Sequence, residues 1–174
     1  MEKAYVYWFF GLSGSGKSTL ADALALRLKS LGEQVLRLDG DQMRAGINKD
    51  LGFSSQDRLE NVRRAAEIAK LSLEQGISVV ASFISPEDIH RRKVKEVLGA
   101  KVHLIFVDAS IETCKLRDVK GLYQQQAQGN ISSFTGVSAP FEKPMDASMR
   151  ISTEESSVEA CIDQIMKQWK EQNA

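Results

Sequence analysis

GLSGSGKST, residues 11–19, is the stretch of sequence that decides the fold of this chain. It fits the pattern G-x-x-x-x-G-K-[S/T] and directly follows an apolar run, Tyr5 to Phe10, that is typical of a buried strand. Glycines let such a loop wrap closely around a polyphosphate, so that its backbone N–H groups point at the phosphate oxygens. The stretch therefore predicts a loop that binds a nucleoside triphosphate, between a strand and a helix that starts near Lys17.

Three features of this loop suit the parts of a triphosphate. The N-terminus of the following helix adds a partial positive charge. Lys17 supplies a full charge for the β- and γ-phosphates, and the Ser18 hydroxyl is placed to ligate Mg²⁺. The residues expected to bind the triphosphate are Gly11, Leu12, Ser13, Gly14, Ser15, Gly16, Lys17, Ser18 and Thr19.

The composition fits a single folded domain, residues 1–174. A chain of 174 residues, 43% of them apolar, has room for one domain with a full core. Lysine plus arginine and aspartate plus glutamate each number 23, so the balanced charge predicts neither a nucleic acid nor a membrane partner. No apolar stretch approaches the roughly 20 residues that span a bilayer. Cys114 and Cys161 lack metal-ligand spacing, which indicates reduced core thiols in a cytoplasmic protein.

Strand and helix patterns alternate along the whole chain. The expected strands cover residues 4–10, 34–38, 77–82, 101–107 and 149–151. Three helices are expected over about residues 17–31, where Gly32 is the stop, and over 55–75 and 152–172. Two more are expected to begin after caps at Ser85 and Ser110. This order predicts the three-layer α/β fold of P-loop kinases, with a parallel sheet of about five strands and helices on both faces. Residues 119–147, which hold a glutamine run, scattered glycines and two prolines, are expected to form a mobile lid.

Polar residues follow the predicted strand ends. Asp39 and Asp41 come after the second strand, Ser85 after the third and Asp108 after the fourth. Because the carboxyl ends of parallel strands meet at one edge, these residues predict a single active site. A kinase needs a carboxylate there to hold Mg²⁺ through its water shell or to accept the proton of the attacking hydroxyl. We expect Asp41 to take the catalytic role and, with Ser18, to hold Mg²⁺, and Asp39 to support it.

A group of arginines follows the aspartate pair. Arg58 and Asn61 are three apart on a predicted helix and share a face, so both can reach one ligand. Arg44 and Arg58 lie close to the aspartates in the sequence, and guanidinium groups suit bidentate binding of phosphate or sulfate oxygens. For Arg63 and Arg64, a solvated helix face is the favoured interpretation.

Phe53 and Phe134 lie in predicted loops. A loop aromatic commonly packs into the core, and for either residue alone that interpretation is favoured. Two of them near a nucleotide site suggest a base held by stacking, which is worth about 1–3 kcal/mol per base. Lys120 and Tyr123 belong to the predicted lid, whose closure excludes water and so limits transfer of phosphate to water.

Together these residues resemble the adenylylsulfate kinase (APS kinase) family over about residues 5–145. The matching segments are GLSGSGKST, LDGDQMRAGINKDLGFSSQDRLENVRR (38–64), SFISP (82–86), RDVKGLY (117–123) and FTG (134–136). The resemblance implies an enzyme that, with Mg²⁺, moves the γ-phosphate of ATP to the ribose 3′-hydroxyl of adenylylsulfate, giving 3′-phosphoadenylylsulfate. Since members commonly form dimers, it also implies a homodimer.

The resemblance further implies the site residues. ATP would bind through residues 11–19, and the residues implied to meet the sulfated nucleotide are Asp41, Arg44, Phe53, Arg58, Asn61, Ile84, Ser85, Lys120, Ser133 and Phe134. Phe53 and Phe134 would lie on either side of its base. Ser85 matches a serine sometimes described in this family as a phosphoserine intermediate, and it completes a candidate catalytic set with Lys17, Asp39 and Asp41. The residues themselves favour a helix cap that helps shape the acceptor pocket, because direct in-line transfer needs no covalent intermediate.

The lid departs from the family pattern. The family usually continues KGLY with basic residues, whereas residues 124–129 here read QQQAQG, and the usual tyrosine is Phe141. The missing charges leave a second hypothesis open: a kinase of the same fold that acts on the 3′-hydroxyl of another modified nucleotide, such as cytidine diphosphoramidate. A third hypothesis, a nucleotide-binding switch without catalysis, is disfavoured because the phosphate loop and the aspartate pair are intact.

Overall fold

The computed structural model describes residues 4–131, 134–145 and 147–173. Within these ranges it contains a sheet of five parallel strands in the order β2-β3-β1-β4-β5. The strands are β1 (Val6–Phe10), β2 (Val35–Asp39), β3 (Ser78–Phe83), β4 (Val102–Asp108) and β5 (Met149–Ser152). Each begins and ends within one or two residues of its predicted position, so the predicted sheet is confirmed.

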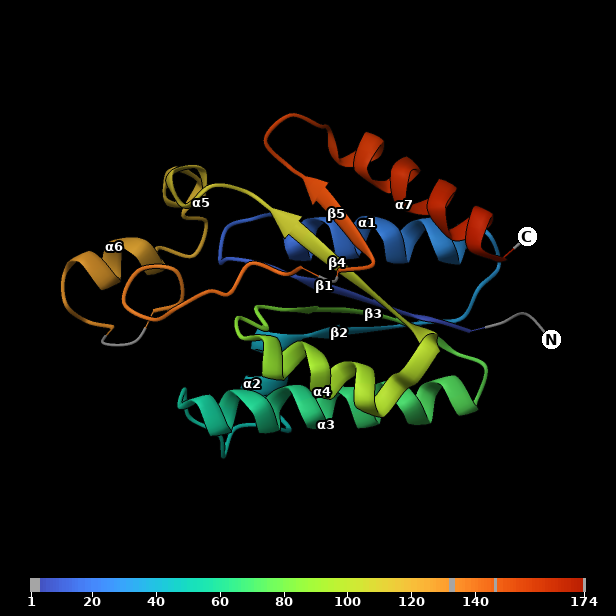
Figure 1. The fold of residues 1–174 in the computed structure, drawn as a ribbon, viewed down its shortest axis with the longest axis horizontal. Helices are drawn as coiled ribbons and strands as arrows, with labels where there is room; N and C mark the ends of the chain where they lie inside the picture. Colours follow the sequence, from blue (N-terminus) through green and yellow to red (C-terminus); the bar gives the residue numbers. More distant parts are fainter. Residues whose placement is uncertain (1–3, 132–133, 146, 174) are drawn as a thin grey trace.

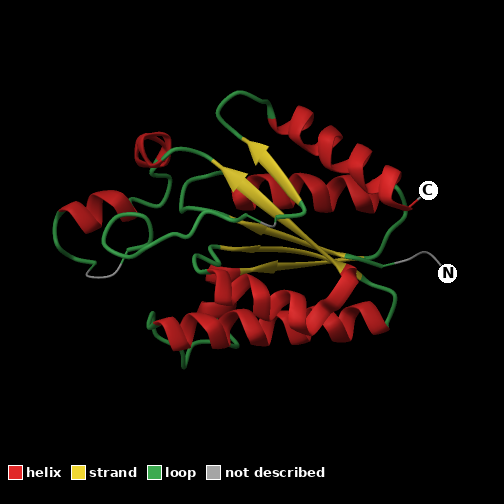
Figure 2. Cartoon of the chain, in the orientation of Figure 1, coloured by secondary structure: helices red, strands yellow, loops and turns green. Residues whose placement is uncertain are grey.

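Helices cover both faces of this sheet. Helices α1 (Lys17–Ser30) and α7 (Val158–Asn173) lie on one face, and α3 (Ser55–Glu74) and α4 (Asp88–Leu98) lie on the other (Figure 1). Figure 2 shows the resulting arrangement, with the strands as a middle layer between two layers of helices. This is the three-layer P-loop kinase fold that the sequence predicts.

Strand β1 lies at the centre of the core because both of its faces are buried. Trp8 and Phe10 pack with the side chains of α3 and α4, whereas Tyr7 and Phe9 pack with those of α1 and α7. Burial of one large apolar side chain contributes about 1.5–3 kcal/mol relative to exposure. The loop that follows β1 therefore starts from a strand that is held firmly on both sides.

Helix α4 begins later than predicted. Its N-cap is Glu87, which forms a capping box with His90, and its first helical residue is Asp88. The expectation that Ser85 caps this helix is therefore wrong. The chain first makes a turn, in which Ser85 has a left-handed φ of 41°, and only then enters the helix.

Helix α7 and the helix that follows β2 also differ from the prediction. Helix α7 begins at Val158 rather than at Ser152, because β5 continues through Ser152 and a turn precedes the helix. The Ser157 hydroxyl accepts a hydrogen bond from the N–H of Ala160 at the start of this helix. Helix α2 (Gly40–Ala45) directly follows β2 and was not predicted, because its length gives no apolar periodicity to detect.

The lid region lies beyond the carboxyl ends of the strands. Figure 1 shows α5 (Ile111–Arg117) and α6 (Leu122–Ala127) there, beside the loop that leads towards β5. Cys114, Tyr123 and Phe134 pack together in a small apolar cluster that joins these elements. Movement of residues 119–147 as a lid stays a prediction.

Two smaller expectations, the cap of α5 and the state of the two cysteines, are confirmed. The Ser110 hydroxyl accepts a hydrogen bond from the N–H of Thr113 and so caps α5. Cys114 and Cys161 are both buried free thiols. Of the helices in the described ranges, none combines the length and the apolar character that crossing a membrane requires.

Candidate active site

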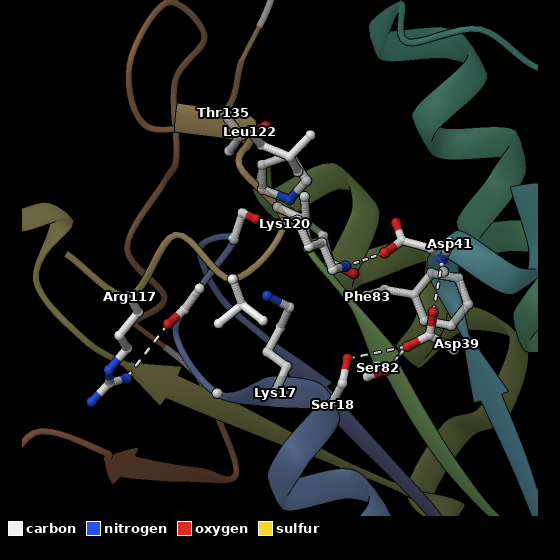
Figure 3. A pocket seen from close by; sticks show the side chains of 18 of the residues that line it. Lys17, Ser18, Asp39, Asp41, Ser82, Phe83, Arg117, Lys120, Leu122 and Thr135 are labelled. Atoms are coloured by element: carbon white, nitrogen blue, oxygen red, sulfur yellow. Dashed lines mark hydrogen bonds and ion pairs between the residues drawn. The ribbon is translucent and has the colours of Figure 1, made fainter. Parts of the chain in front are cut away.

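The carboxyl ends of the strands border a cavity of about 870 Å³, seen from close by in Figure 3. Its volume falls in the range of roughly 300–1,000 Å³ that is common for ligand sites. The predicted site residues that line it are Ser13, Gly14, Gly16, Lys17, Ser18, Thr19, Asp39, Asp41, Arg44, Phe53, Arg58, Asn61, Ile84, Ser85, Lys120 and Phe134. Gly11, Leu12, Ser15 and Asp108 are not part of its lining, and Ser133 lies outside the described residues. The expectation that Asp108 joins the site is therefore wrong, and its carboxylate pairs with Arg150 instead.

Close backbone packing fixes the shape of the phosphate loop, residues 11–19. A Cβ at Gly11 would lie 2.5 Å from the carbonyl oxygen of Val107, and one at Gly14 would lie 2.9 Å from that of Cys114. Gly14 also has a φ of 79°, which glycine adopts without a steric penalty. The Ser15 hydroxyl is buried and has no hydrogen-bond partner among the described residues. A tightly turned loop without intruding side chains fits the close approach of a polyphosphate.

Lys17 is buried at the start of α1, and its ammonium group donates to the carbonyl oxygen of Leu12. Burial, and after it the positive charge of Lys120, lowers the pKa of Lys17 to about 8. Charges at a desolvated site are weakly screened, so they interact with an anion more strongly than exposed charges do. Lys17 is therefore placed to bind phosphate oxygens.

Asp39 is the N-cap of α2, and four donors surround its carboxylate. The hydroxyls of Ser18 and Ser82 donate at 3.1 and 2.8 Å, and the N–H of Asp41 donates at 3.0 Å (Figure 3). The N–H of Gln42 donates at 3.3 Å. Burial acts to raise the pKa of Asp39, but these hydrogen bonds outweigh it and hold that pKa below its usual value. Asp39 is therefore a fixed, ionised carboxylate at the edge of the phosphate loop.

The contact between Ser18 and Asp39 gives a pair of oxygens that suits Mg²⁺. A hydroxyl and a carboxylate are ligands that Mg²⁺ prefers, and it commonly takes its other ligands from phosphates and water. The described residues contain no group of three or more His, Cys, Asp or Glu side chains that could hold a metal ion. The sequence suggested Ser18 with Asp41, whereas the structure places the carboxylate of Asp39 against Ser18.

Asp41 lies in the first turn of α2 and forms an ion pair with Lys120 of the lid (Figure 3). The side chains are 68% and 52% exposed, respectively. An exposed ion pair contributes about 0–1 kcal/mol. The carboxylate of Asp41 can therefore exchange Lys120 for another partner at little cost.

Arg44 and Arg58 both approach the ring of Phe53, at 4.5 and 5.8 Å from its centroid. Arg44 donates to the carbonyl oxygen of Gly52 at 2.7 Å, and Arg58 donates to the Thr135 hydroxyl at 3.0 Å. Burial lowers the pKa of both guanidinium groups, and the charge of Arg58 lowers that of Arg44 further. Two such groups at one end of the cavity can bind phosphate or sulfate oxygens.

The two candidate base-stacking rings differ in their surroundings. Phe134 is buried and packs edge-on against Tyr123, with ring centroids 4.8 Å apart. Phe53 is 63% exposed. Both line the cavity, as does Asn61, whose amide oxygen accepts from Asn48 at 2.8 Å. The interpretation of a loop aromatic that packs into the core is therefore right for Phe134 and wrong for Phe53.

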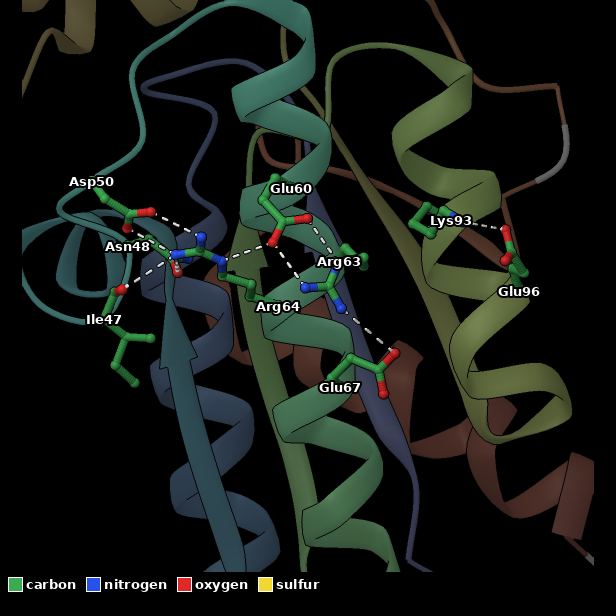
Figure 4. Close-up of polar contacts among 9 residues, drawn as sticks. All are labelled: Ile47, Asn48, Asp50, Glu60, Arg63, Arg64, Glu67, Lys93 and Glu96. Carbon is green, nitrogen blue, oxygen red and sulfur yellow. Dashed lines mark hydrogen bonds and ion pairs between the residues drawn. The ribbon is translucent and has the colours of Figure 1, made fainter.

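Arg63 and Arg64 form a surface network instead of joining the site (Figure 4). Both bind the carboxylate of Glu60, at 2.7 and 2.8 Å, and Arg64 also binds Asp50 at 2.8 Å. Neither residue lines the cavity. The interpretation of these two as a solvated helix face is confirmed.

Comparisons with known proteins place the chain in a family. The family model described as "Adenylylsulphate kinase" matches residues 3–152. The chain belongs to the adenylylsulphate kinase family.

Its relatives in this family are similar over most of their length. An adenylyl-sulfate kinase of Paraburkholderia xenovorans is 48% identical over 161 residues, which cover 92% of this chain and 90% of that protein. One of Staphylococcus epidermidis is 45% identical over 170 residues, which cover 97% of this chain and 85% of that protein. A solved structure of the Mycobacterium tuberculosis APS kinase CysC, in complex with AMPPNP and APS, superposes with a TM-score of 0.93 at 35% identity and covers 97% of this chain and 98% of that one.

Arg117 and Thr153 are among the cavity-lining residues that sequence reasoning missed in this adenylylsulphate kinase family member. Arg117 donates to the carbonyl oxygen of Thr153 at 2.8 Å and to its hydroxyl at 2.9 Å, and the Thr153 hydroxyl donates to the carbonyl oxygen of Ser15 at 2.7 Å. These contacts tie the segment after β5 to the phosphate loop. Arg117 lies within the matching segment RDVKGLY, but no sequence pattern marks Thr153, which the fold brings to the loop.

Proposed function

We propose that this chain is an ATP-dependent kinase that transfers the γ-phosphate of ATP to the ribose 3′-hydroxyl of adenylylsulfate. The observation that carries the proposal is a cavity whose wall joins the phosphate loop to Arg44, Phe53 and Arg58. Such a cavity has room for a donor and an acceptor nucleotide together. The proposal is supported by the relatives named adenylyl-sulfate kinase and by the related structure that holds AMPPNP and APS.

The donor side orients the triphosphate. The backbone N–H groups of residues 11–19 and the ammonium group of Lys17 bind the phosphate oxygens, which aligns the γ-phosphate with the acceptor side. Ser18 and Asp39 would hold Mg²⁺, which when bound neutralises charge on the β- and γ-phosphates. Arg117 and Thr153 keep the loop in place from the other side.

The acceptor side binds the sulfated nucleotide. Arg44 and Arg58 bind its phosphate or sulfate oxygens, and Phe53 and Phe134 contact its base. The other residues proposed to contact this nucleotide are Asn61, Ile84, Ser85, Lys120 and Ser133. Together these contacts bring the 3′-hydroxyl towards the γ-phosphate.

Asp41 serves as the base in the transfer. Its exposed carboxylate exchanges Lys120 for the 3′-hydroxyl and accepts the proton as that oxygen attacks the γ-phosphate. Lys17 stabilises the charge that spreads over the phosphoryl oxygens. The phosphoryl group passes directly from one nucleotide to the other in line, so no covalent bond to the protein forms.

A coupled assay of ADP release tests this function. With ATP, Mg²⁺ and adenylylsulfate we expect turnover that depends on the acceptor. Cytidine diphosphoramidate at a matched low concentration is the comparison, because α6 carries Gln124, Gln125 and Gln126 and no charged side chain. A larger kcat/KM for adenylylsulfate supports the proposal, and a larger one for the cytidine nucleotide means that these glutamines accompany a different acceptor. ATP turnover that does not depend on either acceptor contradicts the proposed kinase function.

We also propose that the protein is a cytoplasmic homodimer. A related solved structure, at 29% identity and a TM-score of 0.72, is described as a hexameric APS kinase from Thiobacillus denitrificans, and this chain covers 29% of that chain. At least one similar protein is therefore described as an oligomer. Light scattering after size-exclusion chromatography gives the mass in solution, and a mass of one chain contradicts the dimer.

A further inference from the structure

The turn that follows β3 carries an unusual backbone conformation. Among the described residues, Ser85 is the one residue other than glycine whose φ lies in the left-handed region above +20°, at 41°. A side chain in this left-handed region is strained, and such a conformation persists only where surrounding contacts determine it. Ile84, Ser85 and Pro86 all line the cavity. The strain therefore lies in the wall of the candidate site.

Two buried side chains hold this turn from the core. The indole N–H of Trp8 donates to the Ser85 hydroxyl oxygen at 3.1 Å. The guanidinium group of Arg91 donates to the carbonyl oxygens of Ser85 and Pro86 at 3.0 and 3.2 Å. Trp8 is fully buried, and Ser85 and Arg91 are each 2% exposed. The turn is thus bonded through both its side chain and its backbone.

The side chains of Trp8 and Arg91 are themselves held in place by other contacts. Trp8 stacks on Phe83 with ring centroids 4.7 Å apart. Arg91 lies over the ring of Phe10, 5.3 Å from its centroid, and its guanidinium group is 3.8 Å from the carboxylate of Asp88. Buried N–H groups without acceptors are costly, so the donors and the turn hold each other in one arrangement.

The same contacts connect the turn to the donor side. Trp8 belongs to β1, the strand that leads directly into the phosphate loop. The N–H of Gly11, the first residue of that loop, donates to the carbonyl oxygen of Ile84 at 3.3 Å. One strand therefore fixes both the loop that faces the triphosphate and the turn on the acceptor side.

We propose that Trp8 and Arg91 are positioning residues for the acceptor nucleotide, because they hold the Ser85 turn in the conformation that shapes one wall of its pocket. This inference rests on the proposed kinase function. The Ser85 hydroxyl is the anchor for Trp8 and forms no bond to phosphorus. Loss of either partner relaxes the turn and weakens acceptor binding. The phosphate loop keeps its shape, because it also packs against the backbone of Val107 and Cys114 and is bonded to Thr153.

A double-mutant cycle on Trp8 and Ser85 tests the inference. Trp8→Phe keeps an aromatic ring and removes the N–H donor, and Ser85→Ala removes the acceptor oxygen. We expect each change to raise the KM for adenylylsulfate about tenfold and to leave the KM for ATP within about twofold. The double variant should match the single ones, because either change alone already breaks the bond.

Arg91→Lys extends the test to the second donor. Lysine keeps the charge, but a single ammonium group does not reproduce the guanidinium geometry that serves two carbonyl oxygens. We expect the KM for adenylylsulfate to rise about tenfold here as well, with the KM for ATP again within about twofold. Far-UV circular dichroism and the melting temperature show whether each variant folds. If Arg91→Lys does not fold, the cycle on Trp8 and Ser85 still tests the inference.

Ser78→Ala is the matched control. Ser78 is, like Ser85, a buried serine, but it is the first residue of β3 and so lies at the opposite end of that strand from the turn. Its hydroxyl accepts from the backbone N–H of Tyr5 and donates to the carboxylate of Glu33. This variant should lower the melting temperature and leave both KM values unchanged.

Three results would overturn the inference. The first is a double variant whose effect is the product of the single effects, and the second is an equal rise in both KM values. The third is loss of kcat in Ser85→Ala alone, which would make this serine a nucleophile. A wild-type enzyme without adenylylsulfate-dependent ADP release is a different failure: the proposed function falls first, and this inference falls with it.

Discussion

The donor and acceptor sides of the cavity are built in opposite ways. Most of the donor side is one continuous stretch, residues 11–19, which packs closely against the backbone of Val107 and Cys114 and is bonded through Ser15 to Thr153. The acceptor side is assembled from α2, α3, the turn after β3 and the lid. Its elements meet through side chains far apart in the sequence, such as Lys120 with Asp41. A short motif can therefore encode the first side, whereas the second depends on the whole fold.

The two sides should also respond differently to substitution. Lys17 is buried and weakly screened, so its charge acts at full strength on a phosphate. Lys120 and Asp41 are more than half exposed, and water can replace either one. Loss of a donor-side group should therefore stop turnover, whereas changes on the acceptor side should give graded effects that separate binding from chemistry.

The largest effect is expected from Lys17→Met. Methionine keeps much of the length of the side chain and removes the charge, so kcat should fall by roughly 10²- to 10³-fold. Lys29→Met is the control, because Lys29 is an exposed lysine of the same helix, and its kcat should stay within about twofold of wild type. ADP release at saturating ATP and adenylylsulfate measures both. A Lys17→Met enzyme with kcat close to wild type would show that the donor side does not rely on this charge.

A smaller effect, specific to chemistry, is expected from Asp41→Ala. We expect kcat to fall about 100-fold and the Kd for ATP to change less than about twofold, because a base acts on the transition state. Asp39→Asn is the partner experiment. It keeps the shape of the carboxylate and removes its charge beside Ser18, so a higher Mg²⁺ concentration should be needed for half the maximal rate. Equal losses of kcat and ATP affinity in Asp41→Ala would count against its assignment to the acceptor side.

The sequence predicted where the phosphate loop lies, between β1 and α1. The motif defines the loop, and runs that alternate with helical patterns define the five strands. The pattern is clearest in β1, β3 and β4, which are buried on both faces. Arg44, Arg58 and Phe53 were also expected near one ligand, and the structure brings them together. Local patterns were sufficient wherever neighbours in the sequence remain neighbours in the fold.

The sequence could not predict the contacts that the fold creates. Ser85 has the right residues around it for a helix cap, but Trp8 and Arg91 hold it in a turn, and Glu87 takes over the cap. Thr153 approaches the phosphate loop only because β5 lies beside β4. Asp39 rather than Asp41 contacts Ser18 because α2 begins directly at the end of β2. In each case a tertiary contact decides between two locally reasonable arrangements.

A modest effect is expected where the lid meets the donor side. Gly136 and Gly129 both have left-handed backbones, with φ of 86° and 77°. A Cβ at Gly136 would lie 2.6 Å from Leu12 Cδ2, whereas one at Gly129 would have nothing within 4 Å. Alanine strains the backbone at both sites, but only Gly136→Ala also displaces the Leu12 side chain. Its KM for ATP should rise by about threefold to fivefold and that of Gly129→Ala by less than about twofold. Equal changes would mean that the lid affects ATP through backbone strain alone.

The smallest expected effect is on the pH dependence of ATP binding. Burial and the charge of Lys120 lower the pKa of Lys17 to about 8, so Lys17 is charged below this pH and loses its charge above it. A phosphate binds the charged form better, so the affinity for ATP should be constant below about pH 8 and fall as the pH rises further. Titration calorimetry with ATP and Mg²⁺, without an acceptor, measures this directly.

Lys120→Met extends this measurement. The variant tests whether the charge of Lys120 on the acceptor side acts on Lys17 on the donor side. The substitution removes a positive charge that lowers the pKa of Lys17, so the midpoint of the fall in ATP affinity should move to higher pH. Lys29→Met, on the exposed face of α1, should leave the midpoint in place. A midpoint that does not move in Lys120→Met would mean that the lid lies too far from Lys17 in solution to repel it. The donor side would then be electrostatically independent of the acceptor side, in addition to being specified by its own short sequence motif.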